Sequence, residues 1–126
     1  MSRKVTDIED LMAQLLKELG LKFKREYYIG NYPVDFYLPD YKLSIQTDGC
    51  WHHSHKNCKL AAGKKYPRQV FQVRRDKACM AYHKHVKISI LRIRECTLKG
   101  DRDKVINIIY DCLEKITKGK LISEFI

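Results

Sequence analysis

The densest group of reactive side chains lies between Cys50 and Cys58, where three histidines, two cysteines and the only tryptophan fall within nine residues. Thiolate and imidazole are ligands that Zn²⁺ prefers, and a short loop lets them converge, so this stretch predicts part of a tetrahedral zinc site. At least one further ligand has to come from elsewhere in the chain. A histidine that is not needed for metal is free for proton transfer, which imidazole performs well near neutral pH.

Two of the acidic residues before this cluster, Asp35 and Glu9, are candidates for a chemical role. Asp35 interrupts the apolar β pattern from Val34 to Leu38, where a carboxylate is retained most easily if it binds a cation or lies at an open sheet edge. An exposed acid on the polar face of a half-buried strand explains Asp35 equally well. Glu9 follows Thr6 by three residues, which is the spacing of a capping box, so a structural role as a helix cap competes with catalysis.

A third acid, Asp76, lies among basic residues in a helical pattern. It is either an ion-pair partner for its arginine neighbours or an orienting group, because a carboxylate that accepts a histidine ring N–H fixes the tautomer of that histidine.

The elements that have to position these groups are read from hydrophobic periodicity and turn residues. The pattern predicts a helix, an antiparallel three-stranded meander, a second helix, a buried strand and a third helix, with a loop at Thr97–Gly100 and no assignment for the tail Gly119–Ile126. The second helix is expected to bury Val70, Val73, Ala78, Ala81 and Tyr82. In chain order the predicted ranges are Thr6–Leu19, Leu21–Ile29, Val34–Leu38, Tyr41–Thr47, Arg68–Lys84, Lys87–Arg94 and Asp101–Lys118.

Composition predicts a single globular domain over residues 1–126, because the chain is long enough to bury its own core. Lysine and arginine outnumber aspartate and glutamate by 25 to 15, which gives a net charge of +10 and favours a polyanionic partner, with a basic soluble surface as the alternative. No apolar run has the length of a membrane span and no signal sequence is recognisable, so we expect an intracellular protein. Five cysteines, an odd number, fit metal binding and free thiols better than a disulfide framework, with Cys79 and Cys112 as small core residues.

Several short motifs occur together in one order. This ordered set resembles the very-short-patch-repair (Vsr-type) branch of the PD-(D/E)XK nuclease superfamily, which includes Vsr-like homing endonucleases, over about residues 5 to 115. The motifs are Ile8-Glu9, Val34-Asp35-Phe36, Ile45 to His53, Arg74-Arg75-Asp76 and Arg94 to Leu98.

The resemblance implies an α/β restriction-endonuclease-like core, with a central mixed sheet of about four strands flanked by helices and a structural zinc site. It implies a Mg²⁺-dependent DNA endonuclease that nicks or cuts both strands, of homing, phage or DNA patch repair type. By the resemblance, Asp35 is the principal Mg²⁺ ligand, Thr47 offers its carbonyl to the metal, and Glu9 binds or orients the metal's water shell. His52 is the general base, which Asp76 orients.

The zinc ligands implied by the resemblance are Cys50, His55, Cys58 and Cys96, with His53 as the competitor of His55. Cys96 comes 38 residues after Cys58, just past the predicted buried strand, and reaches the cluster if that strand lies beside Tyr41–Thr47.

Two positions depart from the family pattern. Cys50 is followed directly by Trp51, without the additional aromatic residue that patch-repair members use at a mismatch. Gln46 stands where related nucleases have a glutamate, so it can ligate Mg²⁺ through its amide oxygen but brings no charge. Gln46 is the reason to keep a second reading, a catalytically inactive zinc-stabilised DNA-binding module, although binding alone has no use for the set Glu9, Asp35, His52 and Asp76.

The expected partner is double-stranded DNA, with no membrane contact and with the protein as a monomer or weak dimer, in the cytoplasm or nucleoid or in the host cell of a phage. Trp51 is expected to stack on or wedge between bases, or alternatively to be a core aromatic beside the zinc loop. The expected DNA contacts are Trp51, Lys64, Lys65, Arg68, Arg74 and Arg75.

Overall fold

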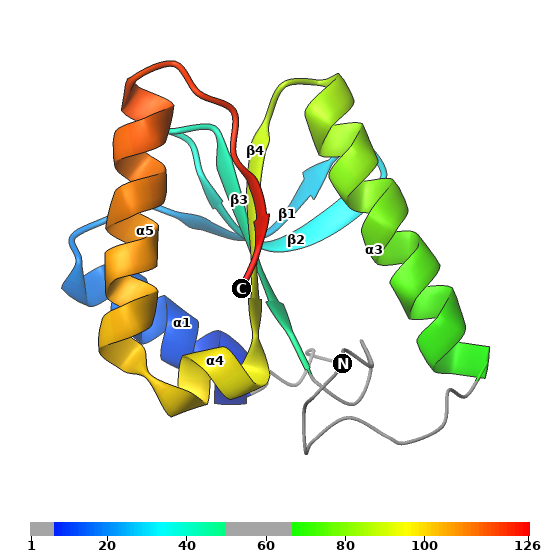
Figure 1. The fold of residues 1–126 in the computed structure, drawn as a ribbon, viewed down its shortest axis with the longest axis horizontal. Helices are drawn as coiled ribbons and strands as arrows, with labels where there is room; N and C mark the ends of the chain where they lie inside the picture. The colour runs from blue at the N-terminus through cyan, green and yellow to red at the C-terminus, as the bar shows by residue number, and fades with distance from the viewer. Residues whose placement is uncertain (1–6, 50–66) are drawn as a thin grey trace.

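The computed structural model of the chain describes residues 7–49 and 67–126. At its centre is a five-stranded mixed sheet in the order β1-β2-β3-β4-β5 (Figure 1). The first three strands form an antiparallel meander, and β3, β4 and β5 are parallel to one another. The strands are β1 (Lys24–Ile29), β2 (Tyr32–Leu38), β3 (Leu43–Asp48), β4 (Ser89–Arg94) and β5 (Ser123–Phe125).

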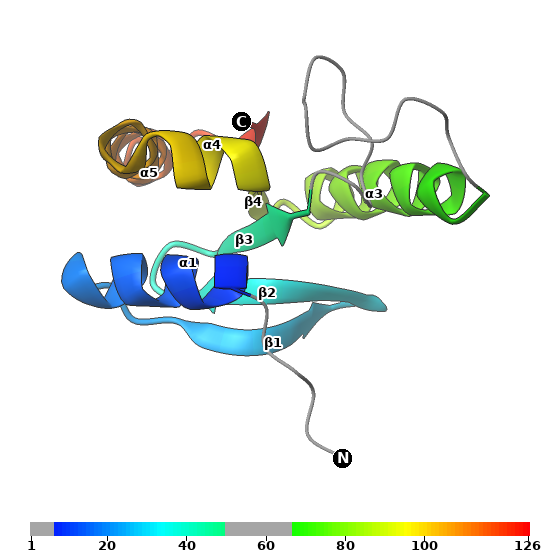
Figure 2. The same ribbon diagram turned by 90° about the horizontal axis from the view of Figure 1, so that it is seen from below.

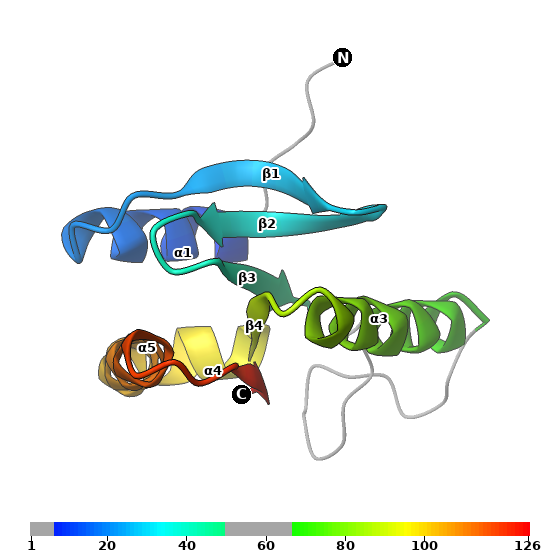
Figure 3. The same cartoon turned by 90° about the horizontal axis from the view of Figure 1, so that it is seen from above.

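Helices cover both faces of this sheet. In Figures 2 and 3, α1 (Asp7–Glu18), α4 (Glu95–Gly100) and α5 (Arg102–Thr117) lie on one side, and α3 (Pro67–His85) lies on the other. Within the described ranges, no helix is both long and apolar enough to cross a membrane.

The hydrophobic core lies between the sheet and the helices α1, α4 and α5. Strand residues alternate between the two faces of a sheet, so Leu43 and Ile45 of β3 face this core while Ser44 and Gln46 face α3. Burying each large apolar side chain contributes about 1.5–3 kcal/mol, and this face carries most of them. The fully buried members include Met12, Leu16, Phe36, Ile45, Leu91, Ile93 and Ile109.

Local signals set the ends of the helices. Helix α1 is followed by Gly20, whose φ of 71° is one that glycine adopts without steric cost. Helix α5 begins after Asp101, whose side chain accepts a hydrogen bond from the backbone N–H of Lys104 at 3.1 Å.

The predicted α/β class, the meander and the flanking helices are confirmed, and three expectations need correction. The sheet has a fifth strand, β5, in the tail that was left unassigned. Thr97–Gly100, predicted as a loop, belongs to the short helix α4. The predicted buried stripe of α3 is wrong at Ala78 and Ala81, which are exposed, because this helix turns the polar residues Asp76 and His83 toward the sheet.

Candidate active site

Strands β2 and β3 separate where the predicted acid lies. Their paired residues end at Phe36 and Ile45, and beyond this pair side chains take over the cross-strand bonds. Asp35 donates its backbone N–H to Gln46 Oε1 at 2.9 Å. Asp35 Oδ2 accepts the backbone N–H of Thr47 at 2.9 Å and its hydroxyl at 2.7 Å. We call this group of Asp35, Gln46 and Thr47 the fork.

The fork holds the Asp35 carboxylate in one orientation beside an open hollow. Asp35 is only 8% exposed, and both of its hydrogen bonds to Thr47 use the same carboxylate oxygen. The other oxygen, Oδ1, makes no hydrogen bond within the part of the chain that the structure describes. The hollow has a volume of about 300 Å³ and is lined by Glu26, Tyr28, Pro33, Val34, Asp35 and Gln46.

Glu26 is a site residue that the sequence analysis missed. The β1–β2 register pairs Arg25 with Phe36 and Tyr27 with Val34, which sets Glu26 opposite Asp35. Its φ of 50° lies in the left-handed region, and its residue lines the same hollow as Asp35. The signal was present in the sequence, because a two-residue turn at Gly30-Asn31 fixes this register.

Glu9 lies on the first part of α1 and is 6% exposed. Its Oε2 is 3.9 Å from Nη2 of Arg25, on the strand that pairs with β2. Arg25 also places its guanidinium 5.4 Å from the ring centroid of Phe36. Burial of Glu9 on the β1–β2 side of the molecule is compatible with either expected role, and its assignment as a catalytic acid stays a prediction.

Asp76 belongs to a buried charged network between α3 and the sheet. Arg92 of β4 donates to both carboxylate oxygens of Asp48, from Nε at 2.9 Å and from Nη2 at 2.8 Å. Nη2 also donates to Asp76 Oδ1 at 2.7 Å, and Gln72 Nε2 donates to the same oxygen at 2.9 Å. Burial acts to lower the pKa of Arg92, but its attraction to Asp48 and Asp76 outweighs this and raises the pKa. Among the described residues Asp76 is thus paired with Arg92 of β4, while the expected pairing with its neighbours Arg74 and Arg75 is not seen there.

A second polar contact joins α3 to β3. His83 is fully buried, its Nδ1 is 2.8 Å from the carbonyl oxygen of Cys79, and its Nε2 is 2.9 Å from the Ser44 hydroxyl. A carbonyl only accepts, so Nδ1 carries the proton and Nε2 of the neutral ring accepts from Ser44. Burial lowers the pKa of His83, and the nearby Arg92 lowers it further against the raising effect of the Cys79 carbonyl bond. Burial likewise raises the pKa of the Cys79 thiol.

The basic residues of α3 lie next to this network. Arg74 and Arg75 are exposed, and the Arg75 guanidinium is 6.0 Å from the ring centroid of Tyr32. Arg75 also lines a hollow of about 170 Å³ that reaches Gln46 and Asp76. The predicted DNA contacts Arg74 and Arg75 thus lie on the side of the sheet that α3 covers.

The half-buried Cys96 lies in α4, two residues beyond Arg94. Arg94 pairs with Asp48 across the parallel strands β3 and β4. The expected neighbourhood of the two strand ends is therefore confirmed, while zinc binding stays a prediction. Among the described residues, no group of three or more histidine, cysteine, aspartate and glutamate side chains is placed to hold a metal ion.

The remaining predicted site residues lie outside the described part of the chain, or, for Arg68, have only their backbone within it. Their roles as zinc ligands, general base and DNA contacts stay predictions. They are Cys50, Trp51, His52, His53, His55, Cys58, Lys64, Lys65 and Arg68.

Comparison with known proteins bears on the resemblance. The family described as "DNA mismatch endonuclease Vsr" has a sequence profile that matches residues 1–60. The catalytic domain of the homing endonuclease I-Bth0305I has a similar structure, with a TM-score of 0.51 over 90% of this chain and 93% of that chain. Over residues 1–60 the chain is Vsr-like. At 21% identity the structural likeness establishes the fold of this Vsr-like chain and not its activity. No curated protein sequence matches it.

The profile match covers only part of the Vsr-like site. Residues 1–60 include the fork, Glu9 and the cysteine and histidine cluster. Asp76 and Cys96 lie beyond the match, so the assignment of their roles depends on the geometry and on the resemblance alone.

Proposed function

We propose that this protein is a metal-dependent DNA endonuclease that hydrolyses phosphodiester bonds. The observation that carries the proposal is the fork. It fixes a buried carboxylate beside an open hollow, at the point where two strands separate, and uses only one of the two carboxylate oxygens. The match to the endonuclease family profile and the net charge of +10 support DNA as the substrate.

The donors at the fork fit Mg²⁺. This ion is typically held by one or two carboxylates and completes its shell with water and phosphate oxygens, so Asp35 and the Thr47 carbonyl suffice if Glu9 or Glu26 holds the water shell. When bound, Mg²⁺ neutralises charge on the phosphate and lowers the pKa of a coordinated water. The chain itself then has to hold Asp35, accept a proton from water and bind the DNA.

Gln46 has a positioning role in this scheme. A backbone N–H can only donate, so the Asp35 N–H fixes the Gln46 amide with Oε1 toward β2 and Nε2 away from it. Gln46 therefore fastens the Asp35 backbone directly, and its oxygen offers at most one remaining lone pair to the metal. A glutamate at this position would make the same bond and add a charge.

The remaining parts of the reaction fall to residues predicted from the sequence. His52 accepts the proton of the attacking water, and Arg74 and Arg75 bind phosphate together with Lys64, Lys65 and Arg68. The exposed position of Arg74 and Arg75 supports their share of this role.

Plasmid nicking by the Asp35→Asn variant tests the proposal. Asparagine keeps an oxygen that accepts the Thr47 N–H and hydroxyl, so the fork and the fold should survive while the anionic metal ligand is lost. We expect cleavage of supercoiled plasmid in Mg²⁺ to fall by about 10²–10³-fold, as for removal of one preorganised charge-stabilising group. Asp40→Asn, at an exposed acid in the β2–β3 turn, is the matched control and should cut at the parental rate.

The outcomes separate the two readings of the chain. Cutting by Asp35→Asn at the parental rate would contradict the proposed mechanism. A wild-type protein that binds duplex DNA but does not cut it in Mg²⁺ would favour the inactive DNA-binding module, which the uncharged Gln46 allows. His52→Ala should reduce cleavage by about 10²–10⁴-fold, the range for a general base.

We also propose one structural zinc ion per chain, held by Cys50, Cys58, Cys96 and either His55 or His53. The position of Cys96 supports this. Arg94 and Asp48 pair with each other at the ends of β4 and β3, and Cys96 follows Arg94 by two residues just as Cys50 follows Asp48. Elemental analysis should find about one zinc per chain, and Cys96→Ser should lose it together with stability, since metal binding is then coupled to folding. Cys79→Ser, at a buried cysteine of α3, should keep the metal. An unchanged zinc content in Cys96→Ser would contradict the assignment of Cys96 as a ligand.

A further inference from the structure

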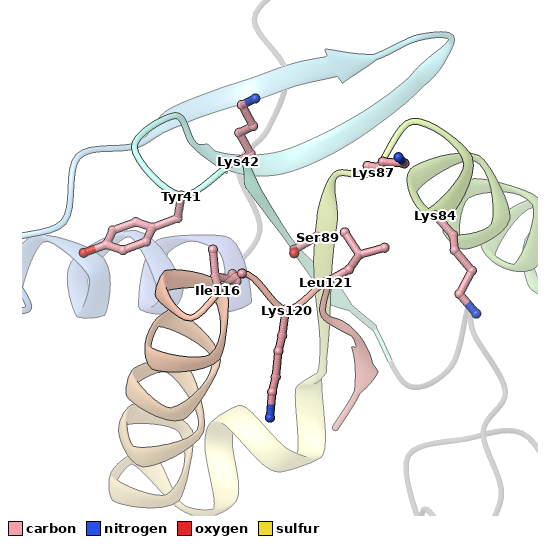
Figure 4. Close-up of a pocket in the computed structure, with 9 residues that line it drawn as sticks. Tyr41, Lys42, Lys84, Lys87, Ser89, Ile116, Lys120 and Leu121 are labelled. Carbon is pink, nitrogen blue, oxygen red and sulfur yellow. The ribbon is translucent and has the colours of Figure 1, made fainter.

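A lysine-rich hollow lies at the end of the sheet opposite the fork. It has a volume of about 470 Å³ and is entered between the starts of β3 and β4 and the ends of α3 and α5 (Figure 4). Ile116 and Leu121 form an apolar part of its wall. Four lysines from three segments of the chain surround it, namely Lys42 before β3, Lys84 and Lys87 at the end of α3, and Lys120 after α5.

The described part of the protein does not neutralise the charge of these four lysines. Within the described residues none of them is in an ion pair, whereas Lys99, Lys115 and Lys118 each pair with a nearby carboxylate. A polyanion bound across the four ammonium groups would neutralise these charges.

Two of these lysines stand where a glycine would fit the backbone better. Lys42 and Lys87 have φ values of 48° and 60°, in the left-handed region. Lys87 occupies the position after α3 at which glycine usually ends a helix. A non-glycine residue in this conformation costs on the order of 1 kcal/mol, so lysine is not the residue that the local backbone favours here.

Stabilisation of helix ends explains the positions of only some of the four lysines. Lys84, Lys87 and Lys120 lie at or after the C-termini of α3 and α5, where the helix dipole favours a positive charge. Lys42 lies in the turn between β2 and β3 and belongs to neither helix end. The hollow thus gathers more positive charge than the two helices need.

The spread of the charges indicates the shape of the ligand. In Figure 4 the four ammonium groups point away from one another around the rim instead of converging on one point. A small anion needs convergent donors, while a nucleic-acid backbone offers a row of separate phosphates. The hollow includes Lys42, just before β3, and the fork lies at Gln46 and Thr47, four to five residues further along this strand. At about 3.3 Å per residue this is a separation of about 13–17 Å, so the two surfaces lie toward opposite ends of β3.

We propose that the lysine-rich hollow binds the phosphate backbone of a second DNA segment while the first segment lies at the fork. This inference rests on the proposed function, since it takes DNA as the ligand of the fork. The protein then bridges two duplexes, or two distant parts of one long DNA, as a single chain.

A bridging assay tests the second surface. A short biotinylated duplex is fixed on beads, protein is added without Mg²⁺ so that DNA is not cut, and capture of a second, fluorescent duplex is measured. The double variant Lys84→Gln/Lys120→Gln leaves Lys42 and Lys87, the two residues in the left-handed conformation, unchanged. Each lysine–phosphate contact that is lost should reduce the slope of log K against log salt by about 0.9. We expect second-duplex affinity to fall about 10–100-fold at about 0.1 M salt, with binding of the first duplex and the melting temperature unchanged.

Two further variants complete the design. Lys42→Asn/Lys87→Asn should also lose bridging, because asparagine tolerates the left-handed conformation and removes only the charge. Lys17→Gln/Lys104→Gln removes two exposed lysines elsewhere and should bridge like the wild type.

The results distinguish this inference from the proposed function. Equal bridging by the wild type and by Lys84→Gln/Lys120→Gln, or binding of one duplex without any bridging, would overturn the second surface alone. Failure of the wild type to bind even the first duplex would overturn the proposed function itself.

Discussion

Removal of the Arg92 guanidinium should be among the most damaging single changes in the protein. Arg92→Met keeps a long apolar stem but deletes three charge-assisted hydrogen bonds of 2.7 to 2.9 Å. The substitution removes the guanidinium partner of two carboxylates, of which Asp48 is fully buried and Asp76 nearly so. Breaking a buried ion pair from one side typically costs about 3–5 kcal/mol. Domains of this size are stable by about 5–15 kcal/mol, so the expected loss is a large share of the total.

Urea unfolding of three variants measures this effect and its cause. Arg92→Met should lower the free energy of unfolding by about 3–5 kcal/mol, and Arg74→Met, at an exposed arginine of α3, by less than about 0.5 kcal/mol. Adding Asp48→Asn to Arg92→Met should recover at least about 1 kcal/mol, because it removes a buried charge that the Arg92 guanidinium no longer offsets. A cost below about 1 kcal/mol for Arg92→Met, or strict additivity of the two substitutions, would refute the reasoning.

Other predictions concern pH, the hairpin and a helix cap. Folding lowers the pKa of His83. Its contribution to stability is therefore complete above pH about 6.5 and is lost as the pH falls toward the lowered folded value. Urea unfolding at several pH values should show that His83→Gln loses less stability in acid than the wild type does. Gly30→Ala should destabilise by about 1–3 kcal/mol, since its Cβ would lie 2.6 Å from the Tyr82 ring at a φ of 60°, and a melting temperature equal to the wild type would contradict the close approach. Asp101→Ala should cost about 1 kcal/mol, because it removes the side-chain cap that accepts the Lys104 backbone N–H. Thermal melts should compare it with Asp103→Ala, which removes an acid from the first turn of α5 but leaves the cap in place.

Much of the fold could be predicted because it follows from local patterns. Helical periodicity gave α1 and α5, and turn residues separated the three strands of the meander. Strand β5 could not be found this way, since its three residues, Ser123 to Phe125, become a strand only through pairing with β4. The short helix α4 was missed because six residues carry too little periodicity to separate a helix from a loop.

The prediction of which residues α3 buries failed for a different reason. An apolar stripe was expected, but the face of the sheet beneath this helix carries Ser44, Asp48 and Arg92. Asp76 and His83 can be buried only because those partners lie opposite them, and this pairing across 16 to 39 residues leaves no local pattern.

The fork was partly predictable. Asp35 and Thr47 were assigned to one site from the resemblance, and the structure brings their side chains within 2.7 Å. Glu26 was overlooked because it looks like an ordinary charged residue of an exposed strand until the hairpin register is worked out.

The polar underside of α3 should determine how this helix docks during folding. A purely apolar helix can slide by one turn, about 5.4 Å, and still bury a similar area. Here a slide of four residues would set Gln72 or Met80 against Arg92, and Cys79 or Lys87 against Ser44, leaving a buried guanidinium short of charge and a hydroxyl without its imidazole. We expect such misaligned states to be too costly to accumulate, so that α3 docks in a single register and carries Arg74 and Arg75 to a fixed position relative to the fork.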